Sequence, residues 1–468
     1  MFLFSSSVVK IHVTSKSIDE SEPWNASTLS ITGSGFVISG QRIITNAHIV
    51  EDSTFIEIQL DGDSKRYKAL KIATSHETDL AVITLDDKSF FNRVKPLKLG
   101  KLPNIHQKVV VLGYPIGGDA LSITEGVISR IEYQIYAHSS LPYLAIQVDA
   151  TINYGNSGGL AMVGDKVIGI VMQLDEDEEG SGGYIIPVNL LKRFLKDISD
   201  GKFDGIPYLP LQSQKLESPV LREGYYKLPA NESGILITQV CANTQAAGLL
   251  QQGDIIKSID GKKIENNGKV FDHNTHFTFL HYVDMHQMGD LLQLEIVRNG
   301  KTKQIKLLLK DLTIAEEEFD QDPRYFIYGG YVFVANKYNE DCMSAKEYAM
   351  SENKNKVDTI TLVNVLPTAY NTGTHQMARF EITEINGQSF NTFKEFYCSI
   401  VNAKTPIILL KNSSGVSLAI DKKIADATSK DTLARYQIHN AQSAEILKWQ
   451  KEGSCHSMSK LSSVNKAG

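Results

Sequence analysis

The chain contains 468 residues, a length that corresponds to about three domains of ordinary size. Hydrophobic residues make up 42% of it and charged residues 22%, a composition typical of globular proteins. The formal net charge of −6 argues against general nucleic-acid binding, which requires a basic excess. No apolar run reaches the length needed to cross a bilayer, so we expect no membrane span.

The N-terminus and the cysteines bear on the compartment. The first residues, MFLFSSSVVKIHV, have no basic segment ahead of their apolar residues, so we expect no cleavable signal peptide. The cysteines lie far apart without a CxxC spacing, which favours neither a disulfide framework nor a cysteine zinc site. They are Cys241, Cys342, Cys398 and Cys455. We therefore expect a protein of a reducing compartment, the cytoplasm.

Short apolar or alternating runs, separated by glycine, proline and aspartate, dominate residues 1–207. They include GFVIS, RIITNAHIV, FIEIQL, LAVITL, KVVVLGY, LAIQVDA and KVIGIVMQ. Strands and turns at this density predict an all-β barrel or sandwich. The segment IPVNLLKRFLKDI at 186–198 changes to helical spacing and predicts a helix that closes this domain.

Two further units share one pattern. The unit from residue 208 has a strand, GILITQV, and ends in a hairpin whose turn signal is Asn299-Gly300. The unit from 316 to 425 repeats a turn, a helix and a terminal strand pair, which predicts the same fold for both units. The remaining residues, 426–468, are polar and predict a helix followed by a disordered tail.

Ser157, in the stretch INYGNSGG, is the candidate nucleophile. A serine hydroxyl needs a general base and a group that orients this base. His48 follows a strand, and Asp79 precedes the apolar strand LAVITL. The order His, Asp, Ser is that of the chymotrypsin-type barrels. His76 is the competing base, but it stands beside the acid in a loop, and we expect it at the surface.

The α/β-hydrolase nucleophile elbow is the alternative interpretation of Gly-Asn-Ser-Gly-Gly. That elbow requires a helix directly after the serine. Here two β-rich runs around a Gly-Asp turn follow, so the elbow is excluded by its context. Gly155 and Gly158 allow a sharp turn. The amides of Gly155, Asn156 and Ser157 are then expected to form an oxyanion hole.

Five motifs in this order resemble those of the HtrA (Deg) serine proteases. They are TNAHIV, TDLAVITL, GYPIGG, SITEGVIS and INYGNSGG. The stretches YGGYVFVA and VVVLGYPIGGDALSITEGVISRIE are most similar to the plant Deg branch with two PDZ domains. The resemblance spans residues from about 5 to 425 and implies His48 as base, Asp79 as its orienting acid and Ser157 as nucleophile.

The resemblance also implies the architecture, which is mainly β. It is a chymotrypsin-like double β-barrel at 1–207, followed by PDZ (α+β) domains at 208–315 and 316–425, with 426–468 as a C-terminal helix and tail. Relatives assemble as trimers or multiples of trimers, often through aromatic N-terminal residues, a role that Phe2 and Phe4 could take here.

Three positions near the nucleophile bear on specificity and competence. Tyr154 and Leu160 stand where many relatives have proline, and Tyr154 borders the oxyanion loop. Thr151, six residues before Ser157, corresponds to the residue deep in the S1 pocket of the trypsin pattern. Because Thr151 carries no charge, we expect small or medium uncharged P1 residues rather than lysine or arginine.

PDZ domains bind a peptide C-terminus by strand addition, with the carboxylate on amides of a glycine-containing loop. In the first PDZ domain this loop is predicted at Gly234, Ile235 and Leu236, with THFTFLHYVDMHQMG as the groove-lining helix. In the second it is predicted at Gly329, Gly330 and Tyr331.

Two other clusters are better explained as ordinary surface. The histidines of the first PDZ unit have spacings that spread them around a helix, so we expect no metal site; they are His273, His276, His281 and His286. The acidic run 175–180 is expected to be a solvated loop on the rim of the specificity pocket.

The sequence thus predicts an ATP-independent serine endopeptidase, without cofactor or metal, that acts on unfolded or damaged proteins. Peptide C-termini at the PDZ domains and a homo-oligomer are the expected partners, with no nucleic acid. The alternative is a peptide-binding chaperone scaffold with weak or absent proteolysis. A third class, a metal-binding sensor, would need metal bound at the histidines.

Overall fold

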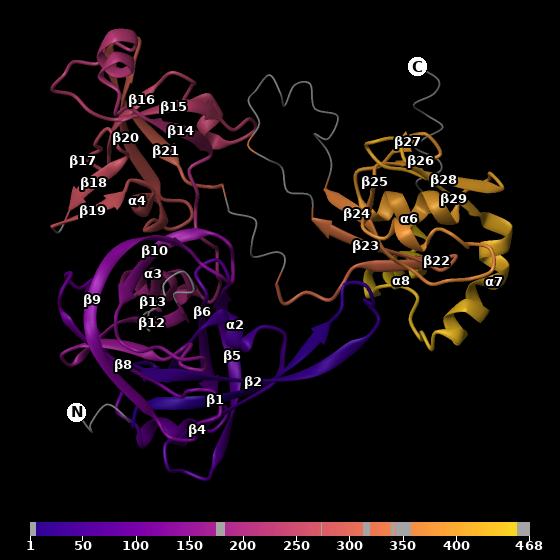
Figure 1. The fold of residues 1–468 in the computed structure, drawn as a ribbon, viewed down its shortest axis with the longest axis horizontal. Helices are drawn as coiled ribbons and strands as arrows, with labels where there is room; N and C mark the ends of the chain where they lie inside the picture. The colour runs from indigo at the N-terminus through magenta and orange to yellow at the C-terminus, as the bar shows by residue number, and fades with distance from the viewer. Residues whose placement is uncertain are drawn as a thin grey trace. The chain divides into compact units, whose positions relative to one another are not determined.

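The computed structural model describes residues 6–174, 183–272, 274–311, 319–337, 342 and 357–455. The chain forms two compact units. The first comprises residues 1–15, 29–319 and 341–350, and the second comprises residues 16–28, 320–340 and 351–468. Figure 1 shows the chain as a ribbon coloured by residue number.

The N-terminal part of the chain forms a closed six-stranded barrel in the order β1-β2-β3-β6-β5-β4. Its strands are β1 (Val8–Ile18), β2 (Ala26–Ile38), β3 (Arg42–Thr45), β4 (Ser53–Leu60), β5 (Arg66–Ser75) and β6 (Leu80–Leu85). Inward-facing apolar side chains fill the barrel, among them Ile11, Ile43 and Ile58, each fully buried. A short helix, α2 (Ala47–Val50), follows β3.

A second barrel follows, with strand order β11-β8-β9-β10-β13-β12-β7 and an additional β11–β12 pairing that closes it. Its strands are β7 (Lys98–Leu99), β8 (Lys108–Gly113), β9 (Ser122–Ile135), β10 (Pro142–Val148), β11 (Leu160–Val163), β12 (Lys166–Leu174) and β13 (Gly183–Pro187). The predicted closing helix is present as α3 (Val188–Asp197), which buries Leu190, Leu191 and Phe194. This part of the chain therefore forms two barrels, which confirms the predicted double β-barrel.

The next sheet has the order β14-β15-β16-β20-β21. Its elements are β14 (Leu211–Lys215), β15 (Ile235–Val240), β16 (Ile255–Ile259), β17 (Lys262–Lys263), β20 (Leu291–Arg298) and β21 (Lys301–Leu308). The predicted Asn299-Gly300 turn joins β20 to β21, and both residues have positive φ, as this hairpin turn requires.

The predicted groove helix of this unit is largely wrong. Its first part is a strand, β19 (Thr275–Thr278), paired with β18 (Lys269–Asp272), and only α4 (Leu280–Asp284) is helical. The alternation in HFTF explains the difference, because Phe277 and Phe279 point to the buried side while His276 and Thr278 do not. This period of two suits a hairpin strand and not a helix.

The second unit contains two four-stranded sheets, β22-β23-β24-β25 and β27-β26-β28-β29. Its strands are β22 (Tyr325–Tyr328), β23 (Tyr331–Lys337), β24 (Asp358–Val365), β25 (Phe380–Ile382), β26 (Glu384–Ile385), β27 (Gln388–Ser389), β28 (Ile407–Lys411) and β29 (Ser417–Asp421). Its helices are α6 (Phe393–Val401), α7 (Lys422–Arg435) and α8 (Ala444–Lys451). Phe333, Phe393 and Phe396 form the centre of its core.

The polar C-terminal segment contains two helices in the described residues, and they pack on this core. Ile446 of α8 is fully buried in it, and Glu445 of the same helix pairs with Arg324 at 2.9 Å. Arg324 also pairs with Asp358 of β24 at 2.6 Å. The C-terminal helix is therefore part of the folded second unit. No helix in the described part of the chain is long and apolar enough to cross a membrane.

The expectation of no disulfide framework is wrong. Cys241 is bonded to Cys342, and Cys398 is bonded to Cys455. The partners lie 101 and 57 residues apart in sequence, so local spacing carries no sign of the pairing. The fold brings the Cα atoms to 4.7 and 5.3 Å, within the usual range for a disulfide. The reducing compartment stays a prediction.

The Cys398–Cys455 bond should stabilise the second unit. A closed loop of 57 residues is worth about 4 kcal/mol in the chain-entropy account, so Cys398→Ser should lower the free energy of unfolding by up to that amount. Urea unfolding followed by tryptophan fluorescence would measure this change. With dithiothreitol present, wild type and variant should coincide. Four free thiols in the untreated native protein would contradict the prediction.

Candidate functional site

His48 and Asp79 are held together by three polar contacts. His48 lies in α2, directly after β3, and Asp79 lies in the turn between β5 and β6. The His48 Nδ1 atom is 2.8 Å from Asp79 Oδ2 and 3.0 Å from Oδ1. The backbone N–H of His48 also donates to Asp79 Oδ1, at 3.0 Å. This arrangement fixes the ring orientation and leaves Nε2 as the nitrogen that can accept a proton.

The backbone of Asp79 is constrained as tightly as its side chain. Its φ of 53° is in the left-handed region, which aspartate tolerates better than most residues. Its N–H donates to the His76 carbonyl at 3.2 Å, and its own carbonyl accepts from the Asn46 amide at 2.9 Å. The Asp79 side chain is 1% exposed, so its carboxylate is shielded from water.

The ionisation of His48 reflects two opposing influences. Burial of the imidazole lowers the pKa of His48, but the charge and hydrogen bonding of Asp79, with a contribution from Glu51, outweigh it. The net result raises the pKa of His48 above its ordinary value of 6.5. A base with a raised pKa accepts a proton more readily once it is neutral.

Ser157 lies in a turn between the barrels, just before β11. Its backbone carbonyl accepts from Ser34 of β2 at 2.9 Å. The turn also lies against the end of β3, because a Cβ added to Gly158 would be 2.4 Å from Thr45 Oγ1. The Ser157 hydroxyl donates to the Met172 carbonyl at 3.3 Å rather than to His48. The Ser157 hydroxyl must therefore leave the Met172 carbonyl before it can donate to the base.

Ser34 is a site residue that the sequence analysis missed. This fully buried side chain donates to the Gly155 carbonyl at 2.9 Å and accepts from the Tyr114 N–H at 2.7 Å. It thus joins the first barrel to the serine loop and to the end of β8. The signal in the sequence is the triplet Gly33-Ser34-Gly35, since small residues inside a strand often mark the close approach of another backbone.

The glycine turn leaves two amides for an oxyanion. The Tyr154 carbonyl accepts from Ile116 N–H at 2.7 Å, and the planar trans peptide therefore directs the Gly155 N–H the opposite way. Gly155 has φ of 93°, and a Cβ there would be 2.4 Å from the Ile116 nitrogen. The Asn156 N–H donates to the Asn153 carbonyl. Of the three predicted donors, only Gly155 and Ser157 therefore have an N–H that makes no backbone hydrogen bond in the described residues.

The three positions expected to shape specificity differ in exposure. Tyr154 is 67% exposed beside the serine turn, whereas Leu160 is fully buried in β11 and paired with both β8 and β12. Thr151 is exposed, although the sequence comparison placed it deep in a pocket. Its carbonyl accepts from Thr124 Oγ1 at 2.9 Å. The acidic run 175–180 lies outside the described residues.

His76 is not the surface residue that its loop position suggested. It is 3% exposed, its Nδ1 is 2.9 Å from Nε2 of His138, and Phe319 stacks on its ring. A turn is often a surface feature, but this one is covered by the turn that carries His138 and by the ring of Phe319, which is distant in sequence. The contact of His76 with the Asp79 turn is made by its backbone carbonyl, which accepts from the Asp79 N–H.

The predicted carboxylate loops of the PDZ units do not lie at free edges. β15, which begins at Ile235, is paired with β14 on one side and β16 on the other. The Gly234 N–H already donates to Asn266 Oδ1 at 3.2 Å. A peptide therefore has no free edge on β15, and the outer strands of this sheet are β14 and β21. The prediction for Gly234, Ile235 and Leu236 is corrected on this ground.

The second predicted loop is a hairpin turn. Gly329 and Gly330 have φ of 57° and 79° and connect β22 to β23. Tyr331 begins β23, which pairs with β22 and with β24, and the Gly330 carbonyl accepts from the Leu366 N–H at 2.6 Å. Both edges of β23 are therefore filled by the chain itself, which leaves no place for an added strand there.

The histidines of the first PDZ unit have separate environments. His281 is buried against Phe277, and burial lowers its pKa to about 4. His286 pairs with Asp260 at 2.7 Å, and His276 pairs with Glu265 at 3.5 Å. His273 lies outside the described residues. In the described part of the chain, no group of three or more His, Cys, Asp or Glu side chains is arranged to hold a metal.

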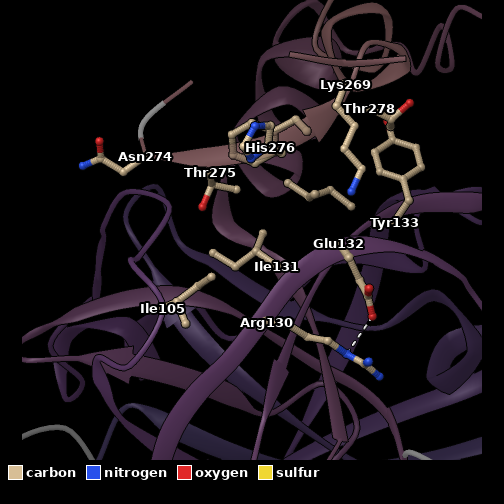
Figure 2. A pocket seen from close by; sticks show the side chains of 12 residues that line it. Ile105, Arg130, Ile131, Glu132, Tyr133, Lys269, Asn274, Thr275, His276 and Thr278 are labelled. Carbon is tan, nitrogen blue, oxygen red and sulfur yellow. Dashed lines mark ion pairs between the residues drawn. The ribbon is translucent and has the colours of Figure 1, made fainter. Parts of the chain in front are cut away.

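A cavity of about 460 Å³ lies away from the His48–Asp79 pair. Its walls come from β9 and from the β18–β19 hairpin, with Arg130, Glu132, Lys269 and His276 around it (Figure 2). Arg130 is paired with Glu132 at 2.7 Å. None of His48, Asp79 and Ser157 lines this cavity, so it belongs to a different part of the first unit.

Three segments match known domain families. Residues 33–170 match the trypsin-like peptidase domain, and residues 211–309 and 314–445 match PDZ domains. The chain is 32% identical over 449 residues to the putative protease Do-like 3, mitochondrial, of Arabidopsis thaliana, covering 94% of this chain and 80% of that protein. The chain belongs to the Do-like (Deg) family of serine proteases.

Other relatives agree with this family. The chain is 38% identical over 334 residues to the protease Do-like 4, mitochondrial, of Arabidopsis thaliana, covering 70% of this chain and 64% of that protein's length. A solved structure of the HtrA-type protease AlgW with a tripeptide has a TM-score of 0.52 at 24% identity and covers 66% of this chain and 95% of its own. The Do-like chain is thus a trypsin-like serine endopeptidase with two PDZ domains.

Replacement of Asp79 should alter both rate and pH dependence. Only neutral His48 accepts a proton, so the acid limb of kcat/KM should lie above pH 6.5 in the wild type. Asp79→Asn removes the main influence that raises this pKa, so the limb should move to lower pH. Loss of ring orientation should lower kcat by about 10³–10⁴-fold. Peptide hydrolysis from pH 5 to 9 would measure both effects, and an unmoved limb would count against the pairing.

Removal of the Ser34 hydroxyl should loosen the serine loop. Ser34→Ala leaves the Tyr114 N–H and the Gly155 carbonyl without this partner, at a cost of about 1–3 kcal/mol in unfolding free energy. We also expect a lower kcat, since Gly155 is itself one of the two proposed oxyanion donors. Thermal unfolding and hydrolysis rates would measure the two effects. Ser27→Ala, on the exposed part of β2, is the control and should change neither.

Proposed function

We propose that the chain hydrolyses peptide bonds through an acyl-enzyme formed on Ser157, with His48 as general base and acid and Asp79 as the group that orients His48. The observation that carries the proposal is the buried Asp79 carboxylate on His48 Nδ1, together with the Ser157 turn against β2 and β3. Once its hydroxyl has left the Met172 carbonyl, Ser157 gives its proton to His48 Nε2 as it attacks the carbonyl carbon. His48 then returns the proton to the leaving amine.

The developing negative charge would be held by backbone amides. Gly155 and Ser157 are the proposed donors, because the Asn156 N–H is bonded to Asn153. Each lost donor in such a hole typically costs about 2.7–4 kcal/mol of transition-state stabilisation. Water then hydrolyses the acyl-enzyme: His48 takes a proton from the attacking water and returns it to the Ser157 oxygen. No step in this scheme uses ATP, a metal or a cofactor.

The substrates that we propose are unfolded or damaged proteins with small or medium uncharged residues at P1. Thr151 offers no charge to select lysine or arginine. The exposed ring of Tyr154 is next to the same turn and is the side chain that we propose to contact P1. Extended, unfolded segments suit such a site because the scissile strand must be free to lie along the enzyme.

Peptide C-termini are the proposed ligands of the first PDZ domain. Since β15 is interior, we propose that the peptide strand adds to the outer strand β14, whose second edge pairs with no other strand in the described part of the chain. Assembly as a trimer or a multiple of trimers is proposed by analogy with relatives. Phe2 and Phe4, suggested for that contact, lie outside the described residues.

A peptide-binding chaperone scaffold is the second candidate. The observation that favours it is the Ser157 hydroxyl, which donates to Met172 and not to His48. If that hydrogen bond persisted with substrate present, the site would bind chains without cleaving them. Tyr154, at the position of a proline in many relatives, is the side chain best placed to influence the loop.

A fluorophosphonate probe separates the two candidates. The probe should label the wild type and its label should be absent from Ser157→Ala, because only an activated serine attacks phosphorus. Labelling with and without an unfolded protein, read by mass spectrometry of the modified peptide, tests competence and activation together. A wild type that takes no label, yet suppresses aggregation of an unfolded client, would support the chaperone scaffold instead.

A further inference from the structure

One aromatic side chain that the proposed mechanism does not use, His138, lies next to His48, and two more, His76 and Phe319, contact His138. His138, in the turn between β9 and β10, has its ring centroid 6.0 Å from that of His48. His138 Nε2 is 2.9 Å from Nδ1 of His76, in the turn that also carries Asp79. Phe319 covers these two rings. We call His76 and His138 the histidine pair.

Phe319 comes from a distant part of the chain, after the last strand of the first PDZ sheet. Its ring is stacked on His76 with a centroid distance of 4.3 Å and an interplanar angle of 6°. The same ring is 4.6 Å from that of His138. His76 is 3% exposed and the His138 side chain 9% exposed, so little of the pair meets water. An aromatic ring thus forms part of the wall that separates the pair from solvent.

The contact within the histidine pair restricts its charge. A hydrogen bond between two ring nitrogens needs one N–H and one lone pair, so both rings cannot be doubly protonated while the bond persists. Glu51 Oε2 lies 4.0 Å from His138 Nδ1, which favours a proton on that nitrogen. The charged and titratable groups around His48 are then Asp79, Glu51 and His138. Glu51 and both histidines have further contacts of their own.

We propose that Phe319 is a positioning residue for the catalytic histidine, acting through the histidine pair: it keeps water from His76 and His138 and so keeps His138 neutral and fixed beside His48. The proposal rests on the proposed protease function. It makes Phe319 part of the support of the active site.

The direction of the effect follows from charge. If Phe319 is removed, water reaches the pair and stabilises a cation on it. A positive charge about 6 Å from His48 disfavours a second positive charge there, so His48 would lose its proton at lower pH. Removal of His138 eliminates that charge altogether. We therefore expect the loss of Phe319 and the loss of His138 to give different acid limbs. A general loss of structure would not produce this difference.

The experiment compares full-length wild type, Phe319→Ala, Phe319→Tyr, His138→Gln and the double variant Phe319→Ala/His138→Gln. The rate of fluorophosphonate labelling at Ser157 is measured from pH 5 to 8, with kcat and KM for a fluorogenic peptide. We expect Phe319→Ala to move the acid limb down by about 0.5–1 pH unit, with KM within about twofold of wild type. Phe319→Tyr should behave as wild type, because the stacked ring is kept.

The double variant decides whether the effect passes through His138. We expect it to have the acid limb of His138→Gln, with no further shift from the loss of Phe319. An unmoved limb in Phe319→Ala, or the same shift in both backgrounds, would overturn the proposal while the protease function stands. A wild type that is not labelled at any pH would instead refute the proposed function and this inference with it.

Discussion

The two barrels hold the serine loop in place through the hydroxyl of Ser34. This hydroxyl donates to the Gly155 carbonyl and accepts from the Tyr114 N–H, and the backbone N–H of Ser34 donates to the Ser157 carbonyl. His48 and Asp79 belong to the first barrel, whereas the serine turn belongs to the second, so neither barrel contains a complete site. The relative placement of nucleophile and base therefore depends on a few buried polar bonds, which a water molecule cannot easily replace at 0% exposure.

The hydrogen bonds around the site also explain why its backbone can adopt unusual φ values. Asp79 has positive φ, and Gly155 and Gly158 have conformations that a side chain would obstruct. Unusual conformations of this kind persist only where surrounding bonds determine them. Here those bonds are the Asn46 amide on Asp79 and the contacts of Ser34 and Ile116 on the serine loop. The site is thus built from turns, but each turn is held by a neighbouring strand.

Local patterns in the sequence predicted local features well. The strands of the barrels, the Asn299-Gly300 turn and helix α3 follow from period and turn chemistry, and the motif order led to the protease family. Features that depend on distant partners were not predictable. Ser34, the His76–Phe319 stack and both disulfides join residues far apart in the chain, and the edges of β15 and β23 are decided by sheet order rather than by their own glycines.

The hydrogen bond from the Ile116 N–H to the Tyr154 carbonyl fixes the orientation of one peptide group. Its strength also determines what fraction of molecules has that orientation. It holds one orientation of the Tyr154–Gly155 peptide, and the opposite orientation would turn the Gly155 N–H away from the oxyanion. A single hydrogen bond contributes about 1 kcal/mol net, which corresponds to roughly a fivefold ratio between two states. A change that weakens this hydrogen bond would therefore lower the fraction of molecules in which the Gly155 N–H points toward the proposed oxyanion site.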